Sequence, residues 1–119
     1  MNLNDVVKEV ISEKLFSSPD EKQKQNNIGN FVIVRTYSAG VHCGYLRLHN
    51  GKEVHLEDAR RIWRWKGANT LNELSKYGCD DEYSRISERV NKIELTEAIE
   101  IIPCELKAEE NLKRSRWGN

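Results

Sequence analysis

The stretch FVIVRTYSAGVHCGYLRLHNGKEVHLEDARRIWRW, residues 31–65, decides the fold that the sequence predicts. Residues 31–37 and 41–49 are rich in β-branched and aromatic side chains, which favour strands. Ser38-Ala39-Gly40 between them is typical of a tight turn, because glycine adopts a positive φ without strain. The two runs therefore predict an antiparallel pair of strands.

The second half of this stretch adds further strands. Asn50-Gly51 is the short hairpin signal of a two-residue type I′ turn, which places His49 opposite Lys52. Residues 52–56 and 59–65 are then two strand segments, with Glu57 and Asp58 as an interruption. We expect an antiparallel β-meander of three or four strands that could curl into a barrel, in an α+β fold.

Three helices are expected around the sheet. The apolar residues of segment 1–16 recur at helical spacing, which predicts an N-terminal amphipathic helix, and the polar segment 17–29 is its linker. Thr70 and Glu73 form a capping box for a short helix ending near Gly78. Segment 106–114 is the last helix. Segment 79–91 is expected to be a loop, and segment 92–103 strands that end at Pro103. Residues 30–119 thus form one α+β domain.

Composition narrows the class of protein. The 119 residues suit a single domain, with 38% hydrophobic and 32% charged residues and a mean hydropathy of −0.73. No run approaches the roughly 18 apolar residues of a membrane helix, and no signal peptide precedes the domain, so we expect a soluble cytoplasmic protein with no membrane partner. Three cysteines without a secretion signal predict reduced thiols. The net charge of +0 means that any phosphate binding depends on a local patch.

Segment 60–66, RRIWRWK, carries four basic residues interleaved with two tryptophans. On a strand, Arg61, Trp63 and Trp65 would share one face, and Arg60, Ile62 and Arg64 the other. Guanidinium groups bind phosphate and aromatic rings stack on bases, so the segment is a candidate binding surface. The alternative is structural, with tryptophans in the core and arginines paired with nearby acids. Lys113, Arg114, Arg116 and Trp117 form a second basic patch, or else a solvated terminus.

Catalytic and metal-binding motifs are missing from the sequence. It contains no phosphate-binding glycine loop, no nucleophile elbow and no zinc-protease or deaminase signature. His42 and Cys43 are adjacent and would point to opposite faces of a strand, and the histidines lack the spacing of zinc ligands. A cysteine–histidine nucleophile pair is formally available but carries no local signature. We therefore expect no enzyme, no metal and no cofactor.

Five strings, VIVRTYSAGVHCGYL, ARRIWRW, GANTLNEL, EYSRIS and LTEAIEIIPC, resemble a family of small phage and prophage proteins first catalogued as a domain of unknown function. We associate that family with the first type of Thoeris anti-defence protein, and the resemblance covers roughly residues 30–116. It implies a sponge that binds a cyclic ADP-ribose isomer intact and thereby blocks a NAD-depleting effector in the infected bacterial cell. It also implies assembly as a dimer or hexamer, and separate capture of cyclic oligonucleotides by some members.

The residues expected to bind the ligand follow from their chemistry alone, as stacking rings, cations and hydrogen-bonding groups. They are Tyr37, His42, Arg60, Arg61, Arg64, Trp65, Asn69, Arg114 and Arg116. The predicted function is non-catalytic sequestration of a cyclic nucleotide immune signal. Two rivals remain: a phage regulator that binds nucleic acid or a host protein through the same strand, although nucleic acid is the less favoured partner, and a small hydrolase that degrades the signal.

Overall fold

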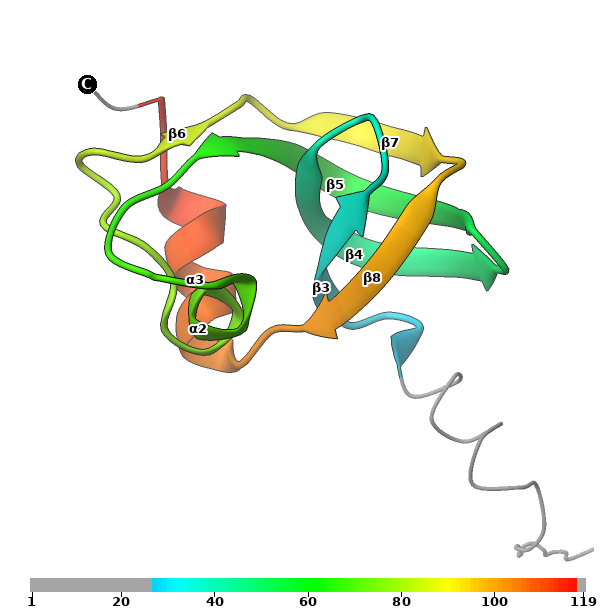
Figure 1. Cartoon of the computed structure of the whole chain (residues 1–119), viewed down its shortest axis with the longest axis horizontal. Helices are drawn as coiled ribbons and strands as arrows, with labels where there is room; N and C mark the ends of the chain where they lie inside the picture. The colour runs from blue at the N-terminus through cyan, green and yellow to red at the C-terminus, as the bar shows by residue number, and fades with distance from the viewer. Residues whose placement is uncertain (1–26, 118–119) are drawn as a thin grey trace, which may run out of the picture.

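A computed structural model describes residues 27–117. It shows an antiparallel sheet with two helices packed against one of its faces (Figure 1). The elements are β3 (Phe31–Thr36), β4 (Val41–Asn50), β5 (Glu53–Arg64), α2 (Leu71–Tyr77), β6 (Arg85–Ile86), β7 (Val90–Leu95), β8 (Ala98–Pro103) and α3 (Leu106–Arg114). The predicted helix over 1–16 and most of the linker over 17–29 lie outside the described residues. Within those residues, no helix is long and apolar enough to cross a membrane.

The expected meander is present as β3, β4 and β5, paired antiparallel in chain order. Gly40 has a φ of 85° in the first turn, as predicted. The second turn differs from the prediction, because Asn50 pairs with Glu53 and the two central residues are Gly51 and Lys52. Only Gly51 has a positive φ, which suits a type II′ turn. The observed register pairs Leu46 with Leu56, so that two buried side chains share the core face.

The predicted interruption at Glu57 and Asp58 is a β-bulge within one continuous strand. β5 runs unbroken through both residues, and Asp58 has a φ of 54°. The register slips between β4 and β5 at this point, opposite Gly44. A Cβ on Gly44 would lie 2.9 Å from the carbonyl oxygen of Glu57, so only glycine fits there. The bulge bends the strand and sharpens its twist.

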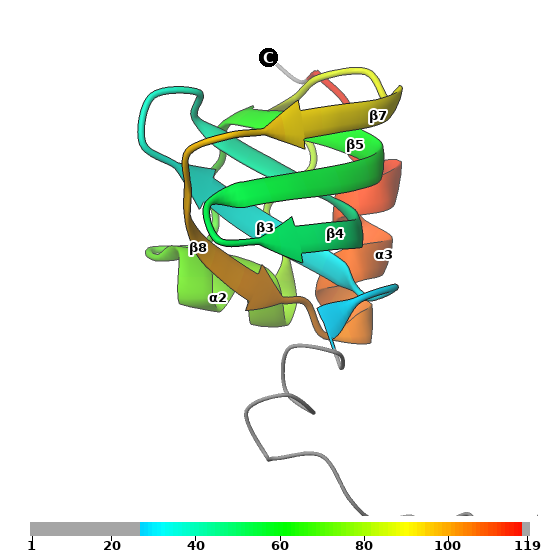
Figure 2. The same ribbon diagram turned by 90° about the vertical axis from the view of Figure 1, so that its right-hand side faces the viewer.

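The sheet curls but does not close. The order is β6-β5-β4-β3-β8, and β7 pairs with β5, so β7 and β8 fold over the meander from its two sides (Figure 2). They enclose a core cluster that includes Val32, Val34, Leu46, Leu56 and Leu95. Within residues 27–117, β7 and β8 are not paired with each other. The α+β class and the meander are confirmed, and the barrel-like character extends only to this open curl.

The other face of the meander is covered by α2 and α3. Ile33, Cys43 and Ile62 of the sheet pack with Leu74 of α2 and Leu112 of α3. Thr70 caps α2 as predicted: its Oγ1 accepts from the backbone N–H of Glu73. The carboxylate of Glu73 in turn accepts from the N–H of Asn69. Gly78 ends α2 with a φ of 81°, and α3 has the predicted bounds.

The segment predicted as a loop, 79–91, contains more structure than expected. Its residues Arg85 and Ile86 form β6, which pairs with the end of β5, and β7 begins at Val90. Two residues are too few for sequence periodicity to reveal a strand. This short strand places Arg85 opposite Arg64, near the end of segment 60–66.

Candidate functional site

Two tryptophans far apart in the sequence stack on the surface. The ring centroids of Trp63, near the end of β5, and Trp117, in the C-terminal segment, are 5.3 Å apart with an interplanar angle of 24°. Trp117 is held there by a β-bridge to Arg85, and the N–H of Ile86 donates to the carbonyl of Arg116. Both indoles remain about half exposed, at 57% and 52%. The C-terminal segment therefore lies beside the Arg/Trp strand rather than free in solvent.

Two guanidinium groups flank this pair. Arg85 lies over both rings, 5.8 Å from the centroid of Trp63 and 5.2 Å from that of Trp117. Arg64 lies 5.5 Å from the Trp63 centroid. The Nε of Arg85 is buried and has no hydrogen-bond partner within residues 27–117. We call Trp63, Trp117, Arg64 and Arg85 the tryptophan platform.

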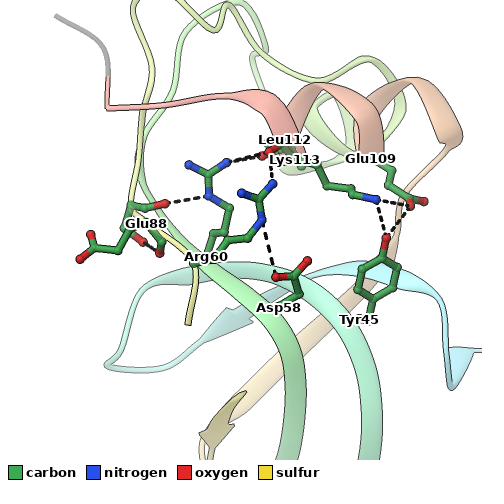
Figure 3. Close-up of polar contacts among 9 residues, drawn as sticks. Tyr45, Asp58, Arg60, Glu88, Glu109, Leu112 and Lys113 are labelled. Atoms are coloured by element: carbon green, nitrogen blue, oxygen red, sulfur yellow. Dashed lines mark hydrogen bonds and ion pairs between the residues drawn. The ribbon is translucent and has the colours of Figure 1, made fainter. Parts of the chain in front are cut away.

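Arg60, a predicted ligand-binding residue, has a different environment. It is 6% exposed and points to the C-terminal end of α3 (Figure 3). Its guanidinium donates to the backbone carbonyls of Ser87 at 2.7 Å and Leu112 at 2.8 Å. Weaker bonds reach the carbonyls of Ile86 and Lys113. Burial next to Arg89 lowers the pKa of Arg60, mainly through desolvation. Since its donors are already used, Arg60 ties α3 to the sheet, and we leave it out of the proposed site.

His42 and Arg61 lie on neighbouring strands and line a cavity of about 240 Å³. The imidazole is fully buried, and its Nε2 lies 2.9 Å from the carbonyl oxygen of Ala39. Burial lowers the pKa of His42, and the nearby positive charge of Arg61 lowers it further. Its other nitrogen, Nδ1, has no hydrogen-bond partner among the described residues. Strand pairing thus places these two of the predicted residues side by side.

The remaining predicted residues are scattered over the surface. Tyr37 is 79% exposed in the β3–β4 turn, where its N–H donates to Glu97. Trp65 lies beyond the end of β5 and packs against the core under the helices, so it does not share the face of Trp63 as expected. Asn69 precedes the cap of α2. Arg114 pairs with Asp81 at 3.2 Å, while Arg116 is exposed beside Trp117.

Three platform residues were missing from the predicted site. Trp63 and Trp117 lie in the two basic patches of the sequence, but nothing in the sequence indicates that they stack. Arg85 lies in the segment that the sequence predicts to be a loop. The only signal that could have suggested the pairing was the repetition of one composition, arginines beside tryptophan, in the strand and in the C-terminal segment.

The thiols and the acidic and imidazole groups of the described residues are the candidates for a nucleophile and for a metal site. Burial raises the pKa of Cys43 and of Cys104 to about 12, so neither thiol supplies a thiolate at neutral pH. Burial also raises the pKa of Cys79. Within the part of the chain that the structure describes, no cluster of three His, Cys, Asp or Glu side chains could hold a metal ion. Exposed rings and guanidinium groups remain, which suit an anionic ligand with a planar ring.

Residues 29–112 match the family described as "Domain of unknown function (DUF6948)", and the chain belongs to that family. The match spans the sheet and both helices up to Leu112, and Trp117 lies beyond it. No curated protein matches the chain.

Two solved structures are similar, each with 18% sequence identity and a TM-score of 0.47. One is a heptameric archaeal Sm protein, where the similarity covers 71% of this chain and 98% of that chain. The other is the SmAP1 heptamer of P. aerophilum, with 76% and 99% covered.

Proposed function

We propose that this protein binds a cyclic nucleotide signal and holds it intact, with the tryptophan platform as the contact surface. The observation that carries the proposal is the exposed Trp63–Trp117 stack with Arg85 over both rings. A base stacked on an aromatic side chain contributes about 1–3 kcal/mol. Guanidinium groups add charge-assisted hydrogen bonds to phosphate. Because the net charge of the chain is +0, phosphate binding depends on a local group of cations. A small patch of this kind favours a compact ligand over a long polyanion.

The resemblance to the Thoeris anti-defence proteins names the ligand class. We propose a cyclic ADP-ribose isomer, with cyclic oligonucleotides as a second class, sequestered in the cytoplasm of an infected bacterium. Sequestration needs affinity and no chemistry on the ligand. The protonated state of the buried thiols supports this, because they offer no activated nucleophile.

We also propose that the protein works as a dimer or hexamer. The support is the amphipathic pattern of segment 1–16, which offers an apolar stripe for a partner chain. Light scattering at micromolar concentration should return a multiple of the 13.8 kDa chain mass. A monomer mass would contradict this part of the proposal.

A second candidate function is binding of single-stranded nucleic acid. The exposed tryptophan pair favours it, since stacked rings accept bases of any polymer. The two functions differ in salt dependence, because a protein that contacts several phosphates loses affinity steeply as salt rises. Preference for an oligonucleotide over a cyclic dinucleotide, with a steep salt slope, would favour the polymer.

The proposed function is tested by calorimetric titration of the full chain with cyclic ADP-ribose isomers. Trp63→Ala should weaken binding at least tenfold, about 1.4 kcal/mol. Tyr77→Ala is the matched control, because Tyr77 is also 57% exposed and carries a cation, Lys107, over its ring at 5.6 Å. It lies on α2, outside the platform. Equal affinities for both variants would contradict the platform as the site.

The fate of the ligand separates binding from hydrolysis. After incubation with excess protein, heat denaturation should release the ligand, and chromatography should recover it unchanged. Recovery of a linear or cleaved product would mean that the protein is an enzyme and would overturn the sequestration proposal.

A further inference from the structure

His42, which lines a cavity together with Arg61, has an unsatisfied acceptor. A carbonyl oxygen can only accept, so the Nε2 of His42 carries the hydrogen that it donates to Ala39 at 2.9 Å. In the neutral ring, Nδ1 is then an acceptor. It is buried without a hydrogen-bond partner in the described part of the chain. Leaving a buried acceptor unpaired costs free energy, which a ligand with an N–H donor would recover.

The other residues that line the cavity limit the kind of ligand that can supply this N–H donor. Ala59, Val90 and Ile93 give the cavity apolar walls, while Arg61 and Glu88 contribute opposite charges. The volume of about 240 Å³ is smaller than the roughly 300–1,000 Å³ of pockets that hold whole drug-sized ligands. The cavity therefore suits one apolar ring that bears an amine, with the rest of the ligand outside.

We propose that this cavity binds the purine ring of an adenine nucleotide, whose exocyclic amine donates to Nδ1 of His42 while Arg61 contacts the adjoining phosphate. The imidazole is fully buried, so the amine reaches it only after neighbouring side chains move. Arg61 is exposed and lines the same cavity, so it is free to move and to contact the phosphate. At C6, adenine presents an amine donor, whereas guanine and hypoxanthine present a carbonyl oxygen, which would face the lone pair of Nδ1.

The position of the cavity connects it with the tryptophan platform. Arg61 and Trp63 are both exposed and lie two residues apart on β5. Two residues of a strand span about 7 Å, a distance that a pyrophosphate can bridge. This inference deepens the proposed function, on which it rests for the identity of the complete ligand: the base enters the cavity, and the rest of the ligand lies against the platform.

The test compares AMP with IMP, in which a carbonyl oxygen replaces the amine at C6 and N1 carries a hydrogen, in calorimetric titrations of the full chain. The unaltered protein should bind AMP at least tenfold more tightly than IMP. His42→Phe, which keeps the ring shape and removes the acceptor, should abolish this preference. His49→Phe is the matched control, since His49 is an exposed histidine of the same strand whose Nε2 lies near the Gly51 carbonyl. It should retain the preference.

A second variant covers the case in which His42→Phe fails to fold. Val90→Trp starts from a 46% exposed position on the cavity wall, so it should fill the cavity and abolish AMP binding without unfolding the chain. Equal affinity for AMP and IMP, no binding of AMP at millimolar concentration, or an unchanged preference in His42→Phe would each overturn the inference.

The test of the cavity and the test of the proposed function can succeed or fail independently. A preference for AMP that depends on His42, without binding of any cyclic isomer, would leave the cavity assigned and contradict the sponge. Binding of a cyclic isomer that depends on Trp63, without a preference for AMP, would support the sponge and overturn the assignment of the cavity.

Discussion

Asn111 of α3 makes two hydrogen bonds to the backbone of Cys79, the residue that follows the end of α2. The N–H of Cys79 donates to Oδ1 at 2.8 Å, and Nδ2 donates to the carbonyl of Cys79 at 2.8 Å. The amide side chain thus pairs with the backbone as a neighbouring strand would. Gly78 fits beside it only because it lacks a side chain: a Cβ there would lie 2.5 Å from Oδ1 of Asn111.

We expect Asn111→Ala to lower the free energy of unfolding by about 2–4 kcal/mol, because two buried backbone groups lose their partners. Asn72→Ala on the exposed side of α2 is the control and should change stability by less than about 0.5 kcal/mol. Urea denaturation measures both. If the two variants were equally stable, the amide pair would not hold α2 to α3.

Arg60 is the second residue that ties α3 to the sheet. We expect Arg60→Ala to destabilise the protein by at least about 2 kcal/mol, since the guanidinium bonds to the Leu112 and Ser87 carbonyls are lost. Arg64→Ala removes an exposed arginine of the same strand and should leave the unfolding midpoint unchanged while weakening nucleotide binding. The reverse pattern, a stable Arg60→Ala and an unfolded Arg64→Ala, would contradict this division of roles.

These two arginines show what sequence reasoning can and cannot reach. The alternation along β5 correctly separates Arg60 from Arg61, but it cannot tell which face a helix will cover. The capping residues of α2 and the bounds of α3 are local features, so the sequence predicts them well. Contacts between segments far apart, such as Arg60 with Leu112, depend on the tertiary fold.

The sequence predicts only part of the candidate site, because the other part depends on contacts between distant segments. His42 and Arg61 were both expected to bind ligand, and strand pairing brings them together. The stack of Trp63 on Trp117 joins residues 54 positions apart (117 − 63), and it requires β6, whose two residues carry no periodic signal. The turn at Gly51 shows a further limit: the burial of Leu46 with Leu56 sets the register there, whereas the prediction followed the Asn-Gly signal alone.

The buried imidazole of His42 should make stability depend on pH. Its pKa is lowered in the folded protein, so between that pKa and the ordinary 6.5 the unfolded chain binds more protons. The free energy of unfolding therefore rises with pH across this window and is constant above it, as far as His42 contributes. The charged groups around the same cavity are Arg61, Arg60 and Glu88.

We expect the loss of stability between pH 7.5 and pH 5.5 to be smaller in His42→Phe than in the unaltered protein, measured by urea denaturation. His49→Phe is again the control, because this exposed histidine should leave the difference unchanged. If His42→Phe lost as much stability on acidification as the unaltered chain, His42 would not be the group responsible.

The last prediction concerns the C-terminal segment. Truncation after Leu112 would remove the Lys113 carbonyl that Arg60 and Arg89 contact, and also the buried Ser115, so it would disturb the fold. Truncation after Arg116 is cleaner, because it keeps the Arg116 carbonyl that accepts from Ile86 and removes Trp117. Half of the tryptophan stack is then lost while the core is intact.

We expect this truncation to leave the melting temperature nearly unchanged and to lower affinity for a cyclic nucleotide at least tenfold, about 1.4 kcal/mol. A chain shortened by Gly118 and Asn119 alone keeps Trp117 and should bind normally. Calorimetric titration of both chains, with a thermal melt of each, decides the role of the segment. Full affinity after loss of Trp117 would mean that the ligand does not use the platform, whereas a large fall in melting temperature would mean that the stack stabilises the fold.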